Sequence, residues 1–136
     1  MLLVRKMILD TLKAGKHIVM DRYSYSGISF SAAKPGMSLE WCKAPEAGLP
    51  APDVVLFLDL PIEKARLRGQ YGEERYERED MQRIVRQNFL DMQSSNWRLI
   101  DASRTVEEVE LSIRKVVLET IENLNDETIK VLWEDM

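Results

Sequence analysis

The stretch VVLFLDL at residues 54–60 decides the fold class, because it is a nearly continuous apolar run of strand length. Such a run is typical of a strand that is covered on both faces in a parallel sheet. Two shorter runs repeat the pattern: HIVM at 17–20, which contains two β-branched residues, and WRLID at 97–101. We therefore predict a predominantly parallel sheet formed by residues 17–20, 54–59 and 97–101.

Helical patterns flank these strands. Apolar residues at helical spacing predict a helix over residues 2–14, and Gly15 stands where a C-cap glycine is expected. Residues 24–33 are predicted to be helical despite Gly27, and Ser38 is the expected N-cap of a short helix through Lys43.

Further helices are predicted after the second strand. Pro61 favours the first turn of a helix that stops near Gly69, and helix resumes at Met81. Thr105 and Glu108 have the spacing of a capping box for a last long helix. Alternating helices and strands indicate an α/β fold with a parallel sheet flanked by helices, in a single domain over residues 1–136.

The composition excludes several classes of function. The 136 residues are 45% hydrophobic and 31% charged, with a net charge of −4, so no general attraction to nucleic acid or an anionic membrane is expected. No apolar stretch has transmembrane length. The single cysteine, Cys42, is expected to be a buried thiol, in agreement with an intracellular location. We expect the cytoplasm, and the nucleus and mitochondrion remain open.

Asp21 and Arg22 directly follow the first predicted strand. Ligands of open parallel sheets bind outside the carboxyl ends of the strands. An arginine there can bind a phosphate through two parallel hydrogen bonds, and a carboxylate can help to hold hydrated Mg²⁺. Taken alone, such a doublet is more often a solvated strand end or a local ion pair.

The loop at 66–78 is the second candidate feature, because arginines alternate there with Gly69 and Gly72. Such a loop could close over a phosphoryl group that is being transferred. Glutamates nearly balance the arginines, so charge counting by itself favours an exposed, solvated loop. The arginines are Arg66, Arg68, Arg75 and Arg78.

Four motifs occur in order along the chain: DRYSYSG at 21–27, LEWCK at 39–43, GLPAPD at 48–53 and ERYE at 74–77. Together they closely resemble the thymidylate kinase family, which are P-loop kinases that transfer the γ-phosphate of ATP to dTMP and form dTDP for dTTP synthesis. The resemblance runs from about Leu12 to Asp101. It implies a nucleotide-binding phosphotransferase with a partial P-loop kinase fold.

The resemblance also implies roles for single residues. Arg22 would bind the phosphate of dTMP, and Asp21 would assist through water bound to Mg²⁺. The thymidine pocket and the deoxyribose would be contacted by Ser26, Gly27, Phe30, Tyr76 and Gln82. Arg68, together with Arg66, would belong to a lid at about 66–78 that closes over the ATP phosphates. Without the resemblance, ordinary helix packing would explain Phe30, and Tyr76 and Gln82 would pass as surface residues. His17, Trp41 and Trp97 are predicted to be packing residues.

The sequence departs from the family pattern at its start. No GxxxxGK[ST] segment is present to hold ATP phosphates. In the family this loop, the first strand, an arginine for the acceptor phosphate and an aromatic residue for thymine would all precede Met1. We therefore expect an N-terminally truncated, catalytically deficient chain, with the inner edges of its strands at 17–20 and 54–59 unpaired. Whether it is a fragment, a gene-model artefact or an isoform stays open, as does acceptance of dUMP.

Two alternatives remain at this point. The chain could be a non-catalytic kinase relative that acts as a protein-binding or dimerisation module, since the family generally forms homodimers through helices. It could also be an unrelated α/β domain. For the complete enzyme the expected partners are dTMP, ATP with Mg²⁺, and a second copy of the chain, with no nucleic acid and no membrane.

Overall fold

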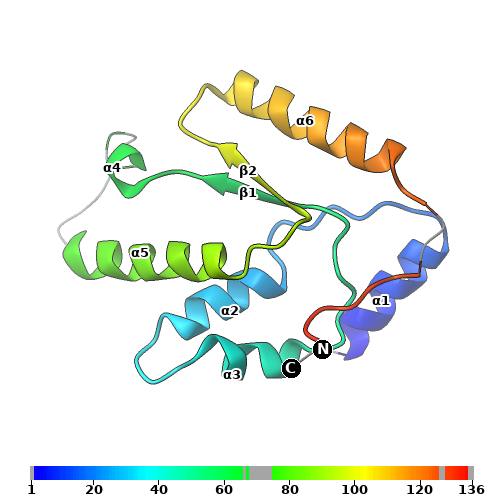
Figure 1. Cartoon of the computed structure of the whole chain (residues 1–136), viewed down its shortest axis with the longest axis horizontal. Coiled ribbons are helices and arrows are strands. Elements are labelled where there is room, and N and C mark those ends of the chain that lie inside the picture. The colour runs from blue at the N-terminus through cyan, green and yellow to red at the C-terminus, as the bar shows by residue number, and fades with distance from the viewer. Residues whose placement is uncertain (1, 66, 68–74, 126–127, 135–136) are drawn as a thin grey trace. The chain divides into compact units, whose positions relative to one another are not determined.

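The computed structural model describes residues 2–65, 67, 75–125 and 128–134 (Figure 1). Its helices and strands, in chain order, are α1 (Leu2–Lys13), α2 (Ser24–Ala32), α3 (Leu39–Lys43), the 3₁₀ turn η1 (Ala44–Glu46), β1 (Val55–Asp59), α4 (Ile62–Ala65), α5 (Arg75–Asp91), β2 (Trp97–Asp101) and α6 (Val106–Glu122). They form two compact units. The first unit comprises residues 1–51, 85–92 and 128–136, and the second comprises residues 52–84 and 93–127.

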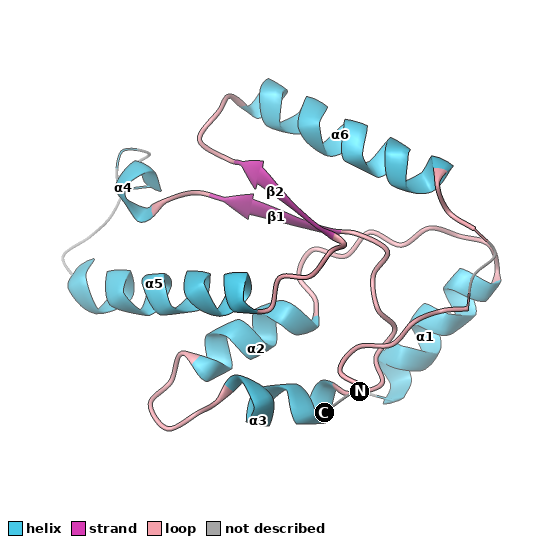
Figure 2. Ribbon diagram, in the orientation of Figure 1, coloured by secondary structure: helices cyan, strands magenta, loops and turns pink. Residues whose placement is uncertain are grey.

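The second unit contains the sheet. β1 and β2 pair in parallel, in a register that runs from Val55 opposite Trp97 to Asp59 opposite Asp101 (Figure 2). Trp97 is buried, and its ring lies 5.9 Å from that of Phe57. Of the predicted packing residues, Trp97 is thus confirmed. The parallel pairing and the positions of these two strands confirm the sequence-based prediction and the α/β fold class.

The prediction of a first strand at HIVM, residues 17–20, is wrong. These residues form no strand, and the side chains of Val19 and Met20 are 93% and 42% exposed. An extended segment becomes a strand only when a neighbour takes up its backbone N–H and C=O groups. Within the described residues, no strand pairs with this segment.

The charged region before Met81 is also more helical than predicted. α5 begins at Arg75, so residues 75–80 belong to a helix and not to the predicted loop. Glutamate and arginine have high helix propensity, and opposite charges four residues apart support a helix. The remaining loop positions, residues 66 and 68–74, lie outside the described residues.

Helix starts in the second unit agree with the local signals. α4 begins directly after Pro61. α6 begins after a complete capping box, in which the Thr105 hydroxyl accepts from the Glu108 amide and the Glu108 carboxylate accepts from the Thr105 amide. α6 then contacts β2.

The first unit is mainly helical. Buried side chains from α1, α2, α3, the loop after η1 and the C-terminal segment contribute to its core: Ile8, Tyr25, Ile28, Cys42, Leu49 and Leu132. α2 contacts α3, whose N-cap is Ser38 as predicted. The side-chain amide of Asn88 on α5 donates to the Ser29 carbonyl of α2 at 2.9 Å. Cys42 is a buried thiol, as expected.

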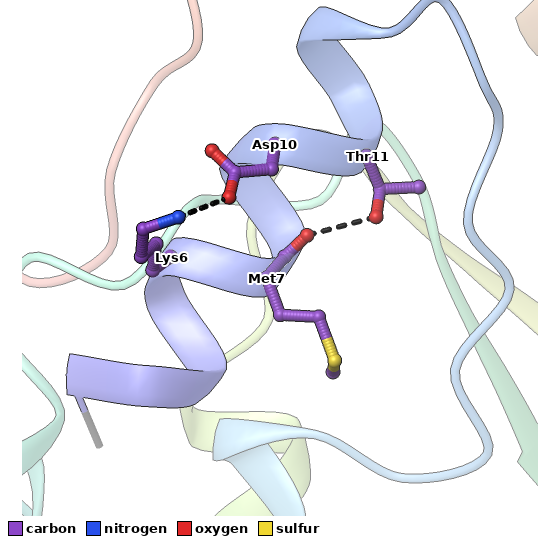
Figure 3. A network of polar contacts seen from close by, with 4 residues as sticks. All are labelled: Lys6, Met7, Asp10 and Thr11. Atoms are coloured by element: carbon purple, nitrogen blue, oxygen red, sulfur yellow. Dashed lines mark hydrogen bonds and ion pairs between the residues drawn. The ribbon is translucent and has the colours of Figure 1, made fainter.

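α1 is stabilised on its exposed side by side-chain hydrogen bonds within the helix. The Lys6 ammonium lies 2.6 Å from the Asp10 carboxylate, and the Thr11 hydroxyl donates to the Met7 carbonyl at 2.8 Å (Figure 3). The hydrogen bond to Asp10 raises the pKa of Lys6.

Within the described residues, none of the helices combines the length and apolar character needed to cross a bilayer. The assignment of residues 1–136 to a single domain stays a prediction.

Candidate acceptor-binding site

Arg22 has an unusual backbone conformation. Its φ is +70°, and among the described residues other than glycine only Trp133 shares a positive φ. The left-handed region costs a residue with a Cβ roughly 1–2 kcal/mol, and such residues are concentrated at functional sites. The Arg22 guanidinium carbon lies 5.8 Å from the centre of the Phe30 ring, within the range of a cation–π contact. Two of the predicted site residues are therefore in contact.

The start of α2 favours an anion beside Arg22. Tyr23 is the N-cap in an extended conformation, and its side chain makes no capping hydrogen bond. The first N–H groups of a helix carry partial positive charge and attract anions. An exposed guanidinium immediately before them adds a full positive charge. The segment Arg22–Ser26 is thus suited to a phosphate group.

The residues predicted to line the thymidine pocket all lie on α2. Ser26 and Phe30 are four residues apart and share one face of the helix. A Cβ added at Gly27 would meet no atom within 4 Å, so open space adjoins this backbone. Phe30 is 37% exposed, which does not suit a core packing residue. This surface is open enough to accept a planar ring.

Asp21 is exposed directly before Arg22. Within the part of the chain that the structure describes, there is no group of three or more histidine, cysteine, aspartate or glutamate side chains that could enclose a metal ion. Mg²⁺ commonly keeps several waters and uses only one or two carboxylates together with substrate phosphates. A single carboxylate at this position fits an indirect contact through water and not a cage of protein ligands.

The other predicted site residues lie elsewhere. Arg66 and Arg68 fall outside the described residues, and so does the side chain of Tyr76, whose backbone belongs to α5. Gln82 is exposed on α5 in the second unit. The lid and deoxyribose roles therefore stay predictions.

Tyr23 is a site neighbour that the sequence analysis missed. Its hydroxyl donates to the Pro50 carbonyl at 3.0 Å. Burial, followed by the charges of Glu46 and Tyr25, raises the pKa of Tyr23 to about 12, so the hydroxyl keeps its proton at neutral pH. No local sequence pattern predicts this contact, because its partner is 27 residues away.

Two residues that the sequence predicted to be packing residues are exposed instead: Trp41 is 66% exposed, and His17 is also exposed. Both side chains therefore lie at the surface and do not pack in the core.

Comparison with a solved structure establishes the class of protein. The thymidylate kinase of Candida albicans superimposes with a TM-score of 0.76 at 31% identity, over 94% of this chain and 66% of that one. Together with the parallel pair of strands flanked by helices, this similarity identifies an α/β protein with a partial P-loop kinase fold.

Sequence comparisons establish the family. The family model described as thymidylate kinase matches residues 1–113, and the chain belongs to the thymidylate kinase family. It is 46% identical over 130 residues to the thymidylate kinase of Arabidopsis thaliana, and 46% identical over 125 residues to that of Danio rerio. These alignments cover 95% and 90% of this chain but only 49% and 59% of the relatives. The chain thus spans about half the length of the curated relatives, and an unrelated α/β domain is excluded.

Proposed function

We propose that these residues form the acceptor-binding part of a nucleoside monophosphate kinase that transfers the γ-phosphate of ATP to dTMP and yields dTDP for dTTP synthesis. The observation that carries the proposal is the placement of Arg22 at the start of α2, with its guanidinium over Phe30, in a member of the thymidylate kinase family.

In this proposal, Arg22 binds the phosphate of dTMP. The planar guanidinium can donate two parallel hydrogen bonds to phosphate oxygens, and the N-terminal amides of α2 add partial positive charge. Ser26, Gly27 and Phe30 contact thymidine, while Tyr76 and Gln82 contact the deoxyribose. Arg66 and Arg68 close over the transferred phosphoryl group as a lid.

Asp21 assists through water in the coordination shell of Mg²⁺, as its exposed position beside Arg22 allows. Mg²⁺ bound together with ATP would neutralise charge on the phosphates. The Asp21 carboxylate would also orient the neighbouring guanidinium by charge attraction. We further propose that the complete enzyme is a homodimer.

We propose that a polypeptide of these 136 residues does not catalyse the reaction by itself. Phosphoryl transfer depends on positioning and charge stabilisation by backbone amides and a lysine around the β- and γ-phosphates. The sequence holds no GxxxxGK[ST] segment for that purpose. Restoring such a segment should restore the activity.

The test joins this chain to the N-terminal segment of a close relative that contains the P-loop, and measures steady-state dTMP phosphorylation. We expect activity in the joined protein. Arg22→Ala should lower kcat/KM by at least about thirtyfold, because truncating one partner of a desolvated charge pair costs roughly 2–5 kcal/mol. The kcat/KM of Arg22→Lys should fall between those of the parent and of Arg22→Ala, because lysine keeps the positive charge but lacks the planar guanidinium that donates two parallel hydrogen bonds.

The control is Lys115→Ala on α6, whose side chain is 77% exposed and should matter little. All variants are compared after equal folding has been verified. Near-parent efficiency of Arg22→Ala would show that Arg22 is not the phosphate-binding residue. A well-folded joined protein without any kinase activity would favour the protein-binding or dimerisation module instead.

A further inference from the structure

The C-terminal strap, defined here as residues 128–133, is paired with the loop at residues 48–51. Val131 forms an antiparallel bridge with Pro50. Three backbone hydrogen bonds join the segments: the Ala51 amide to the Lys130 carbonyl at 2.8 Å, the Leu132 amide to the Leu49 carbonyl at 2.8 Å, and the Gly48 amide to the Leu132 carbonyl at 3.0 Å. The strap is therefore fixed along its backbone.

Trp133, at the end of the strap, contacts the first turn of α2. Its indole N–H donates to the Ser24 hydroxyl at 3.2 Å, across 109 positions of sequence. Its ring meets that of Tyr25 edge to face, with centroids 5.5 Å apart, and the Lys43 ammonium lies 4.8 Å from the Trp133 ring centre. Three different contacts thus hold one side chain.

The backbone of Trp133 is strained, with φ at +60°. A tryptophan that merely filled space in the core would not need this conformation, and Leu132 already supplies a buried apolar side chain there. The two described non-glycine residues with positive φ, Arg22 and Trp133, therefore flank the same helix start. Strain of this kind persists only where surrounding contacts fix it.

The two residues that follow Arg22 are both tied to this region. Tyr23 donates to the Pro50 carbonyl within the loop that pairs with the strap, and Ser24 accepts from Trp133 itself. The backbone directly after Arg22 is therefore held from two sides. Loosening either contact would allow Arg22 to relax out of its left-handed conformation.

We propose that Trp133 is a positioning residue that acts through Ser24 to hold the start of α2, and with it the Arg22 guanidinium, in the orientation that binds the acceptor phosphate. This inference rests on the proposed role of Arg22. It gives the C-terminal strap, which lies beyond the residues 1–113 matched by the family model, a part in acceptor binding.

The experiment uses the 136-residue chain with four variants: Trp133→Phe, which keeps a ring but loses the indole N–H, Ser24→Ala, the double variant, and Trp41→Phe as control. Trp41 is 66% exposed on α3, so its replacement makes the same chemical change at a tryptophan that does not contact Ser24 in the structure. Two quantities are measured: the NMR shifts of the Arg22 side-chain protons, which the Phe30 ring current perturbs, and the affinities for dTMP and thymidine by calorimetry.

We expect Trp133→Phe and Ser24→Ala each to move the Arg22 shifts toward those of an unfolded arginine, while Trp41→Phe leaves them in place. Each should weaken dTMP binding by about threefold to tenfold, the range of one lost hydrogen bond, and leave thymidine binding nearly unchanged. The double variant should be no worse than either single variant, because both remove the same contact.

Unchanged Arg22 shifts in both single variants would overturn the inference. So would an equal loss of dTMP and thymidine affinity, which would indicate a merely structural role. If the parent chain binds neither compound, the affinities are compared in the same variants of the protein joined to the P-loop segment, whose kinase activity separately tests the proposed function, and the Arg22 shifts in the 136-residue chain still decide whether Trp133 positions that side chain.

Discussion

At the scale of single residues, the candidate site depends on one backbone conformation. Arg22 adopts φ of +70°, and its guanidinium then lies over Phe30, which is eight positions along the chain. If the backbone of Arg22 were extended, its side chain would project from the backbone in a different direction. The sequence could indicate Arg22 as a candidate from its neighbours, but its left-handed conformation and its contact with Phe30 are visible only in the folded chain.

A substitution at Gly27 should affect the stability of the fold and the binding of dTMP in opposite directions. Gly27→Ala should raise the free energy of unfolding by about 0.5–1 kcal/mol, because alanine is the better helix former and the added methyl group meets no atom within 4 Å. If Gly27 lines the thymidine pocket, the same methyl group should weaken dTMP binding about fivefold or more through overpacking. Urea unfolding and calorimetry measure the two effects.

Gly36→Ala is the matched control for this experiment. Its added Cβ also meets open space, but φ at Gly36 is +80°, so alanine is strained there and should destabilise the protein by about 1 kcal/mol. Binding of dTMP should stay unchanged. Parent-like dTMP affinity in a stabilised Gly27→Ala variant would remove Gly27 from the proposed pocket.

The buried hydroxyl of Ser29 leads to a prediction about the free energy of unfolding. Its side chain is fully buried, and its hydroxyl oxygen has no hydrogen-bond partner within the described residues. Ser29→Ala should therefore increase the free energy of unfolding by about 1–2 kcal/mol, since an unsatisfied buried polar group is removed. Ser31→Ala, on the same helix and partly exposed, gains only helix propensity, about 0.5 kcal/mol. Equal effects in urea unfolding would argue against an unsatisfied hydroxyl at Ser29.

At the scale of elements, α6 shows how far local signals determine a helix. The spacing of Thr105 and Glu108 predicted its start, and the structure contains both capping hydrogen bonds. Thr105→Ala should lower the free energy of unfolding by about 1 kcal/mol. The conservative variant Thr105→Ser keeps the hydroxyl and should recover most of the loss in urea unfolding. A parent-like alanine variant would mean that the cap contributes nothing to global stability.

The capping box also makes stability depend on pH. The hydrogen bonds from the Thr105 amide and hydroxyl lower the pKa of Glu108 below its usual 4.5 in the folded chain. The folded state therefore binds the proton less well, so the stabilisation is complete above about pH 4.5 and is lost as the pH falls through the lower folded pKa.

The pH effect is measured by comparing the parent with Glu108→Gln in urea unfolding at several pH values. The parent should be the more stable above pH 4.5, and the difference should disappear in acid. The comparison is necessary because hydrogen bonds from Ser103 also lower the pKa of Asp101, which gives both proteins a shared acid dependence. A difference that is constant with pH would contradict the assignment.

At the scale of the whole molecule, the sequence combines the proposed acceptor-binding residues with the lack of a GxxxxGK[ST] segment. We expect no specific ATP binding by the 136-residue chain at millimolar concentration, because a nest of backbone amides and a P-loop lysine are needed to bind a triphosphate. Calorimetry and thermal shift with and without Mg²⁺ test this. The protein joined to a P-loop segment is the positive control. Saturable, Mg²⁺-dependent binding by the unjoined chain would refute the prediction.

The sequence by itself determined the features that depend on neighbouring residues. The apolar runs indicated the positions of β1 and β2, the serine and threonine caps fixed the starts of α3 and α6, and the ordered motifs indicated the family. Each of these signals is contained in a few consecutive residues, where propensity, capping and burial act locally.

Only the tertiary structure decided what depends on a distant partner. The run at 17–20 is apolar enough for a strand, yet it stays exposed because a strand exists only through pairing with another segment. The contact of Trp133 with Ser24 likewise requires residues far apart in sequence. Local patterns carry no information about such pairs, because the chain must fold before they meet.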